Sequence, residues 1–175
     1  MGIVPAKVYL DSCIVIYLLE EHPQFSDRVR HAFETSQNRR FCISPLVELE
    51  CLVGPLRAKN TLLIQRYENF FQYQIILEID SSVYRHAAQL RAQHGLKTPD
   101  ALHLAIAFYH GCIELWIMII TLMPLPPTKQ LTYSNEGKRS LYKTFIAYKK
   151  VTKVDEYLTV ERATLVKLMS AIACP

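Results

Sequence analysis

The chain of 175 residues has few of the features that define fibrous, secreted or membrane proteins. It contains only five glycines, which excludes a collagen-like repeat, and its five cysteines are widely spaced without a Cys-x-x-Cys pair. Its longest apolar run, residues 115–123, is well short of the ~18 residues that a membrane-spanning helix needs. No secretion signal precedes Lys7. We therefore expect a cytoplasmic protein that has no contact with membranes and keeps its thiols reduced and mostly buried.

Charge is distributed unevenly along the chain. Residues 1–116 carry 11 Lys and Arg against 12 Asp and Glu, a net charge of −1. Residues 117–175 carry nine basic and four acidic residues, a net charge of +5. The overall charge of +4 would by itself suggest nucleic-acid binding, but all of the basic excess lies in the last third of the chain. The net charge therefore gives no argument about the function of the first 116 residues.

Short apolar segments typical of buried strands alternate with longer segments typical of helices. The expected strands are residues 7–10, 40–43, 75–80 and a segment that begins at Glu114. The expected helices are residues 13–20, 24–36, 45–53, 57–73, 82–94 and a segment that begins near Thr98, with Ser44 and Ser81 as the N-caps of the third and fifth helices. Gly54-Pro55 and Gly95 are the expected helix stops. This alternation leaves little room for hairpins and predicts an α/β domain with a mainly parallel sheet.

The alternation ends at Trp116. Residues 117–131 contain three prolines and show no clean period, and residues 134–175 contain no alternation of strand and helix. There are no internal repeats and no low-complexity tract. The sequence thus predicts a domain over residues 1–116 and an atypical basic tail over residues 117–175.

Three carboxylates occupy positions from which they can meet at one edge of the sheet. Asp11 follows the first strand, Glu50 lies in a helix that begins just after a strand, and Asp100 lies at the start of a late helix. The carboxyl ends of parallel strands gather such residues into one crevice, and oxygen ligands suit Mg²⁺. Spacing alone leaves an alternative open, in which Asp11 and Asp100 cap helices and Glu50 is solvated.

Residues 8–20, 43–57 and 95–116, taken together and in this order, resemble PIN-domain ribonucleases, in particular the VapC toxins of bacterial VapBC toxin–antitoxin pairs. The resemblance implies a three-layer α/β/α fold and an endoribonuclease that depends on Mg²⁺ or Mn²⁺ and cleaves structured RNA. It also implies a homodimer and a cognate VapB-type antitoxin that holds the activity in check. The segment around Thr98-Pro99-Asp100 is the most specific of the three.

The resemblance also assigns site residues. It assigns metal binding and catalysis to Asp11, Glu50 and Asp100, with Ser12 and Ser44 in supporting positions. Asp11 and Asp100 are expected to bind Mg²⁺ directly or through water, and Glu50 to position a water or a second ion. Glu48 competes with Glu50 for this assignment, but it lies two residues away and therefore on a different face of the helix.

One residue of the family pattern is missing. In the family the last strand continues into Thr-Asn-Asp, whereas this chain has Ile117-Met118-Ile119. Ile-Met-Ile-Ile can be encoded by ATA ATG ATA ATN, and one inserted C after the first A gives ACT AAT GAT AAT, which encodes Thr-Asn-Asp-Asn. We therefore hypothesise a one-base deletion, or a sequencing error, near codon 117, so that residues 117–175 are translated out of frame. The alternative is a genuine extension; in either case we expect weak or no activity from this chain.

Two other functions remain open from the sequence. The first is a catalytically dead PIN domain that acts only as an antitoxin-binding module. The second is a phospho-acceptor domain that uses Asp11, which is disfavoured because lysine and hydroxyl partners are missing from the matching loops. His103 follows Asp100 by three residues, but we expect it to have a packing or surface role. We likewise expect the aromatic residues between Tyr67 and Tyr73 to pack within the domain rather than stack on bases.

Overall fold

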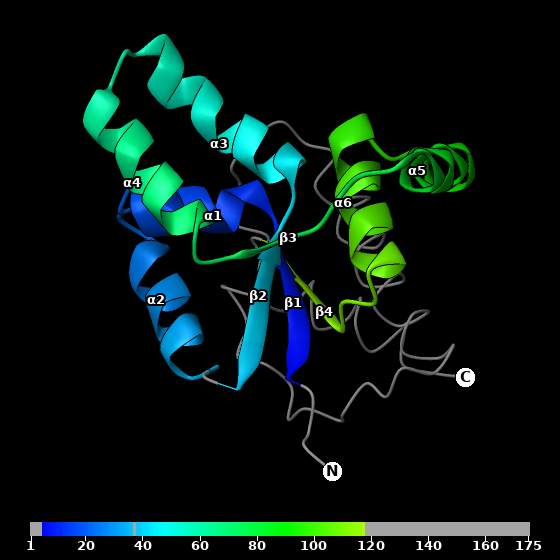
Figure 1. Cartoon of the computed structure of the whole chain (residues 1–175), viewed down its shortest axis with the longest axis horizontal. Coiled ribbons are helices and arrows are strands. Elements are labelled where there is room, and N and C mark those ends of the chain that lie inside the picture. Colours follow the sequence, from blue (N-terminus) through cyan, green and yellow to red (C-terminus); the bar gives the residue numbers. More distant parts are fainter. Residues whose placement is uncertain (1–4, 37, 118–175) are drawn as a thin grey trace.

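A computed structural model of the chain describes residues 5–36 and 38–117. Their centre is a four-stranded sheet in which every pair of neighbouring strands is parallel (Figure 1). In spatial order, the strands are β3 (Ile75–Ile76), β2 (Arg39–Ile43), β1 (Ala6–Leu10) and β4 (Glu114–Trp116). The α/β class and the parallel sheet expected from the sequence are confirmed.

Six helices surround the sheet within the described residues. They are α1 (Ser12–Leu19), α2 (Ser26–Glu34), α3 (Pro45–Arg57), α4 (Thr61–Phe71), α5 (Ser81–His94) and α6 (Thr98–Tyr109). Figure 1 shows α1 to α4 on one side of the strands and α5 and α6 on the other, which gives the expected three layers. None of these described helices is both long enough and apolar enough to span a membrane.

Strand β1 lies in the middle of the core. Val8, Tyr9 and Leu10 have no exposed surface, because β2 and β4 flank the strand and helices cover both of its faces. On one face, Trp116 packs edge-on against Phe33 and Phe41, with ring centroids 5.3 Å and 5.2 Å away. The cysteines of the described part are free thiols and are buried or partly buried, as expected: Cys13, Cys42, Cys51 and Cys112.

Helix α3 runs through the position at which the sequence predicted a stop. Pro55 lies inside the helix, which ends at Arg57. A proline lacks the N–H that would donate to the carbonyl four residues earlier, and its ring crowds that carbonyl. Only two residues of the helix follow Pro55, so the disturbance is confined to its last turns. The helix ends instead where Lys59 adopts a left-handed conformation with φ 53°. There the N–H groups of Lys59 and Asn60 donate to the carbonyls of Leu56 and Pro55, closing the end of the helix.

Strand β3 is much shorter than the predicted strand at residues 75–80. Its pairing with β2 covers only Ile75 and Ile76, opposite Cys42 and Ile43. Because β3 is an edge strand and β2 ends at Ile43, the residues after Leu77 have no neighbouring strand to pair with. The N–H of Leu77 still donates to the carbonyl of Ile43. The apolar pattern correctly predicts a strand at this position, but the length of that strand depends on where its neighbour β2 ends.

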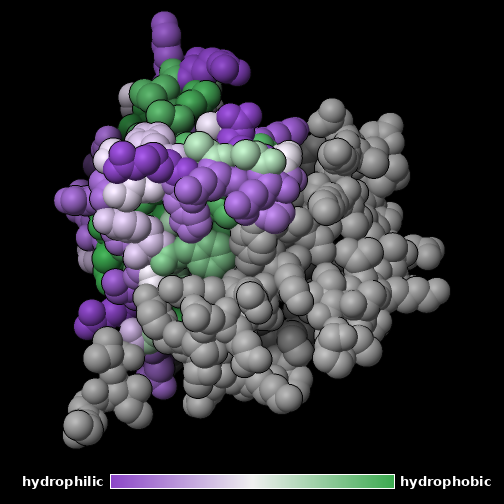
Figure 2. Space-filling view, turned by 90° about the vertical axis from the view of Figure 1, so that its right-hand side faces the viewer, coloured by the Kyte–Doolittle hydropathy of each residue, from purple (hydrophilic) through white to green (hydrophobic). Residues whose placement is uncertain are grey.

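Helices α3 and α4 carry the most exposed apolar surface of the described residues. Tyr67 and Phe71 of α4 are buried, which confirms the expected packing of these aromatic residues, whereas Tyr73, just after the helix, is 87% exposed. Figure 2 shows apolar side chains gathered near the top of the molecule, beneath a hydrophilic tip. The large apolar residues that are exposed on the two helices are Leu49, Val53, Leu56 and Leu62.

The predicted tail lies almost entirely outside the described residues. Ile117, which is buried, is the last residue that the structure describes. The predicted boundary at Trp116 and the hypothesis of a shifted reading frame therefore remain predictions.

Candidate metal centre

Asp11 lies at the carboxyl end of β1, where the strand passes into α1. Its backbone is extended and its carboxylate oxygen Oδ1 accepts a hydrogen bond of 3.2 Å from the backbone N–H of Cys13, so that Asp11 is the N-cap of α1. The backbone N–H of Asp11 donates to the carbonyl of Trp116 at 3.0 Å. These contacts fix the carboxylate at the edge of the sheet. The capping role and a metal-binding role are thus compatible for this residue.

Glu50 approaches Asp11 from α3. The helix begins directly after β2, with Ser44 as N-cap and Pro45 in the first turn, as predicted. The hydroxyl of Ser12 lies between the two carboxylates, 2.6 Å from Glu50 Oε2 and 3.1 Å from Asp11 Oδ1. Because a serine hydroxyl has a single hydrogen, it donates mainly to the closer Glu50. Ser12 therefore connects the two acidic residues, and its supporting role at a metal site stays a prediction.

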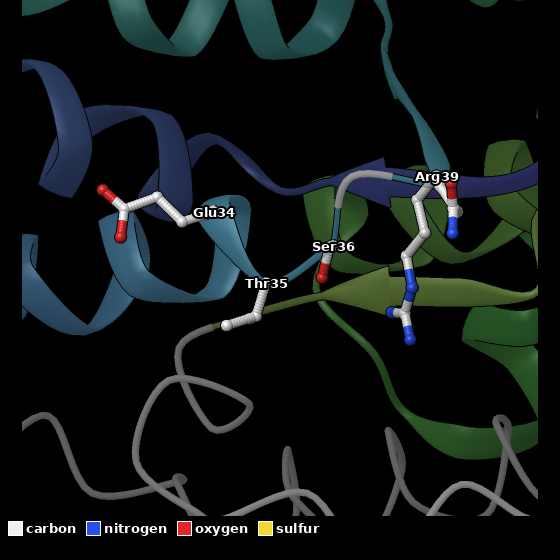
Figure 3. Close-up of a pocket in the computed structure, with 5 residues that line it drawn as sticks. Glu34, Thr35, Ser36 and Arg39 are labelled. Atoms are coloured by element: carbon white, nitrogen blue, oxygen red, sulfur yellow. The ribbon is translucent and has the colours of Figure 1, made fainter.

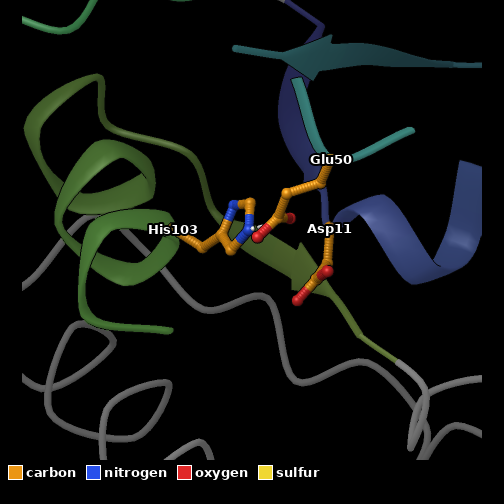
Figure 4. A group of neighbouring side chains, drawn as sticks. All are labelled: Asp11, Glu50 and His103. Atoms are coloured by element: carbon orange, nitrogen blue, oxygen red, sulfur yellow. Dashed lines mark hydrogen bonds and ion pairs between the residues drawn. The ribbon is translucent and has the colours of Figure 1, made fainter. Parts of the chain in front are cut away.

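His103 completes the cluster from the opposite layer of helices. It lies on α6 with 2% of its surface exposed, and its Nε2 is 2.9 Å from Glu50 Oε2. Its Nδ1 is 3.0 Å from the hydroxyl of Tyr9, which in turn lies 2.6 Å from Ser44 Oγ. One ligand atom from each of Asp11, Glu50 and His103 lies within 4.8 Å of the others (Figure 4).

Negative charge dominates the electrostatics of this cluster. Burial alone would lower the pKa of His103. The hydrogen bond to Glu50 and the charges of Asp11, Glu50 and Asp100 outweigh burial, so that the pKa of His103 is raised overall. Burial strongly raises the pKa of Tyr9, which keeps its hydroxyl protonated. The cluster thus contains a surplus of acidic groups, a favourable setting for a cation.

The structure brings together Asp11, Glu50 and Ser12 of the predicted site residues. Asp100 lies in the first turn of α6, one turn before His103, and is partly buried. It is near enough to raise the pKa of His103, but its carboxylate is not within the 4.8 Å group. Ser44 is in the expected N-cap position, yet its hydroxyl contacts Tyr9 instead of a backbone N–H of α3.

From the sequence we expected His103 to have a packing or surface role, and no role was expected for Tyr9. His103 is indeed buried, but both of its ring nitrogens bond to polar groups of the cluster. A signal for it was present, because His103 is the one strongly polar residue in the apolar run at 101–107. A buried imidazole needs hydrogen-bond partners, and two unrelated parts of the chain supply them.

The donor set fits a hard divalent cation. Asp11 and Glu50 supply carboxylate oxygens, which Mg²⁺ and Mn²⁺ prefer. His103 does not add a ligand in this arrangement, because its two nitrogens are already hydrogen-bonded to Glu50 and Tyr9. A cation held by a few carboxylates keeps most of its positions for water and phosphate oxygens, as is typical of Mg²⁺ sites.

A separate hollow of about 280 Å³ lies at the other end of the sheet, beside the start of β2 (Figure 3). The residues that line it are Glu34, Thr35, Ser36, Asn38 and Arg39. The guanidinium of Arg39 forms an ion pair with Glu114, so its charge is already compensated. This hollow shares no residue with the cluster around Asp11 and Glu50.

Several solved structures share the fold of this chain. A toxin–antitoxin complex from Klebsiella pneumoniae matches with a TM-score of 0.54 and 24% identity, over 68% of this chain and 92% of that one. VapBC2 from Rickettsia felis, bound to a DNA fragment from its promoter, matches with a TM-score of 0.55 and 21% identity, over 65% and 89%. VapC20 from Mycobacterium tuberculosis, a toxin that cleaves the Sarcin-Ricin loop, matches with a TM-score of 0.56 and 11% identity, over 63% and 88%.

At these identities the solved structures establish the fold alone, and no curated protein matches the sequence. The family assignment rests on the sequence itself. Residues 8–121, about two thirds of the chain, match the PIN domain family, and this segment includes Asp11, Glu50 and Asp100. The chain therefore belongs to the PIN domain family.

Proposed function

We propose that this protein is a metal-dependent endoribonuclease and the toxic component of a VapBC-type toxin–antitoxin pair. The observation that carries the proposal is the convergence of Asp11 and Glu50, from different elements of a PIN domain, at the carboxyl end of the sheet. Like charges gathered at a partly buried site repel one another, and a divalent cation relieves that repulsion. Such gathering is an expected feature of a cation-binding site.

The chain's own residues hold and orient the reacting groups. When bound, Mg²⁺ or Mn²⁺ stabilises the negative charge that develops on a phosphodiester during hydrolysis. Asp11 and Asp100 would hold the cation directly or through water, and Glu50 would position a water or a second ion. The hydroxyl of Ser12 holds the carboxylates of Glu50 and Asp11 close together by hydrogen bonding. No nucleophilic side chain is required.

The proposed partners are structured RNA as substrate, a VapB-type antitoxin and a second copy of the chain. Structural neighbours are described as toxin–antitoxin complexes, and one is described as a toxin that cleaves the Sarcin-Ricin loop. The exposed apolar residues on α3 and α4 offer surface for a protein partner. A cytoplasmic location follows from this function, since both RNA and antitoxin are found there.

We expect the activity of this chain to be weak or absent. Strand β4 pairs Trp116 with Leu10, the residue before Asp11, so β4 ends next to the cluster. The aspartate of the family pattern would follow there, but the sequence has Ile119, which lies outside the described residues. DNA codons for residues 117–120 that are incompatible with the one-base shift would exclude the deletion hypothesis.

The test is RNA cleavage by the purified chain with Mg²⁺, with Mn²⁺ and with excess EDTA. We expect cleavage only with the cations, loss of that cleavage in Asp11→Asn, and a gain in Ile119→Asp, which restores the missing carboxylate. Glu48→Gln is the matched control, because it removes a carboxylate from the same helix outside the cluster. Cleavage that persists in EDTA or survives Asp11→Asn would refute the mechanism.

The second candidate function is a catalytically dead PIN domain that only binds an antitoxin. The absence of the fourth aspartate from the sequence favours it. Both functions predict antitoxin binding, but only the nuclease predicts cation-dependent cleavage and growth arrest on expression. If Ile119→Asp gains no cleavage while the antitoxin still binds, the binding module is the better description.

A further inference from the structure

We propose that His103 is a positioning residue for Glu50, and that Tyr9 and Ser44 fix His103 in that role. The proposal deepens the proposed function, because it concerns how the cation site is organised. The four side chains form a continuous series of hydrogen bonds from Ser44 through Tyr9 and His103 to Glu50. None of the first three needs to touch the cation.

The hydrogen positions in this series follow from the chemistry of its two ends. The carboxylate of Glu50 only accepts, so Nε2 of His103 must carry the hydrogen in their 2.9 Å contact. In the neutral ring Nδ1 then accepts from the Tyr9 hydroxyl, whose oxygen accepts in turn from Ser44. If the ring is charged, the two contacts behind it reverse direction, but Nε2 still donates to Glu50. The bond to Glu50 is therefore the same in both cases.

The series is rigid because its members are buried and come from separate elements. Tyr9 and Ser44 have no exposed surface and His103 has 2%. Tyr9 belongs to the central strand β1, Ser44 is the N-cap of α3, and His103 belongs to α6. The rings of Tyr9 and His103 also contact each other, with centroids 5.8 Å apart. The imidazole of His103 is thus held in one orientation by its contacts with Tyr9 of β1 and Glu50 of α3.

Glu50 Oε2 is held from two directions as a result. Ser12 donates to it from α1 at 2.6 Å, and His103 donates to it from α6 at 2.9 Å. A glutamate has three rotatable bonds, and two donors that converge on one oxygen select a single arrangement of them before any cation binds. His103 therefore reduces the entropy that Glu50 loses when it takes part in binding a cation.

The test measures Mn²⁺ and Mg²⁺ affinity by calorimetry, together with urea denaturation of each variant in EDTA. His103→Leu removes the donor and keeps similar volume, and we expect its affinity to fall about 10-fold, the size typical of lost outer-shell partners. His103→Gln places an amide N–H near the position of Nε2 and should restore most of that loss. Tyr9→Phe removes only the hydroxyl behind the ring and should cause a smaller loss.

A purely structural role for His103 predicts a different pattern. Leu and Gln variants of equal stability would then have equal affinity, and this result would overturn the proposal. Unchanged affinity in His103→Leu would overturn it as well. If His103→Leu does not fold, Tyr9→Phe decides, and an affinity equal to that of the unsubstituted chain counts against the proposal.

A second measurement separates this inference from the proposed function. Ring ¹⁵N NMR of the cation-free chain should show a hydrogen on Nε2 of His103, and Nε2 without a hydrogen would overturn the proposal. Neither this signal nor the affinity depends on RNA cleavage. If Ile119→Asp gains no cleavage but the affinities follow the expected order, the nuclease function fails and the role of His103 stands.

Discussion

Acidic side chains lie at both ends of the sheet, but they are compensated in different ways. At the amino end, Glu114 of β4 forms an ion pair with Arg39 of β2, and the indole N–H of Trp116 donates to the same carboxylate at 3.0 Å. At the carboxyl end, Asp11 and Glu50 lie together with the hydroxyl of Ser12 and the imidazole of His103. The first carboxylate has a permanent cation from its own chain as partner, whereas the second pair shares a histidine.

The difference separates a structural arrangement from a binding arrangement. A carboxylate paired with arginine is neutralised and needs nothing further. At the other end, burial lowers the pKa of His103, but the hydrogen bond to Glu50 and the charges of Asp11, Glu50 and Asp100 raise it overall. Gathering such groups does not favour stability, and a bound cation, as proposed above, would relieve their repulsion. The comparison predicts that substitutions at the amino end change stability and that substitutions at the carboxyl end change binding.

The largest effect on stability should come from Trp116→Ala. The indole is buried against Phe33 and Phe41 and also bonds to Glu114. Removing a buried aromatic side chain of this size costs about 3–5 kcal/mol of unfolding free energy. Urea denaturation measures the change. Tyr73→Ala, at a position that is 87% exposed, is the control and should cost little; equal losses in both variants would contradict this account of the core.

The sequence predicted best those features that depend on neighbouring residues. Helix α5 ends at His94 as predicted, because Gly95 follows it with φ 67°, whereas its N-cap is Asp80, one residue before the predicted Ser81. The stop at Pro55 was wrong because a proline near a helix end is tolerated. The length of β3 was wrong because it depends on where β2 ends, which is set more than 30 residues earlier in the chain.

In the candidate site, too, features set by neighbouring residues were predictable and features set by distant parts of the chain were not. Asp11 and Glu50 were predicted from local positions in the chain and from the family pattern. The contacts of His103 with Tyr9 and Glu50 join residues 94 and 53 positions apart, and no local pattern specifies such contacts. Only the packing of α6 against the sheet brings these side chains together. The residue set of the site was thus partly predictable, whereas the hydrogen bonds that orient it required the structure.

An intermediate effect on stability should follow Glu114→Gln. The amide can still accept from Trp116, but it leaves Arg39 without its ion pair in a setting where both side chains are only about one-fifth exposed. We expect a loss of about 1–2 kcal/mol, between the values for exposed and for buried pairs. Urea denaturation in EDTA measures it.

Asp11→Asn is the matched substitution at the carboxyl end of the sheet. It keeps an N-cap for α1 while it removes one of the clustered charges, so stability in EDTA should stay equal or rise. Equal destabilisation of Asp11→Asn and Glu114→Gln would contradict the expected difference in stability between the two ends of the sheet.

Asp80 offers a further contrast with Asp11, since both aspartates have an extended backbone and cap a helix. The carboxylate of Asp80 accepts from the backbone N–H groups of Ser82 and Val83 and from the hydroxyl of Tyr109. It is satisfied by donors of its own chain and lies outside the cluster of Asp11 and Glu50. We therefore assign it a structural role alone.

The smallest expected effect is the pH dependence that Asp80 contributes. The hydrogen bond from the Val83 N–H, then that from Tyr109, lowers the pKa of Asp80 below its ordinary value of 3.8. A lowered pKa means that the ionised form stabilises the fold above about pH 4 and that this contribution is lost as the pH falls through the lowered pKa. Asp80→Asn can still cap α5 but does not titrate, so the melting temperature of the unsubstituted chain should exceed that of the variant at pH 6 by more than at pH 3. A gap that stays constant between these pH values would show that the ionised carboxylate contributes nothing beyond the cap.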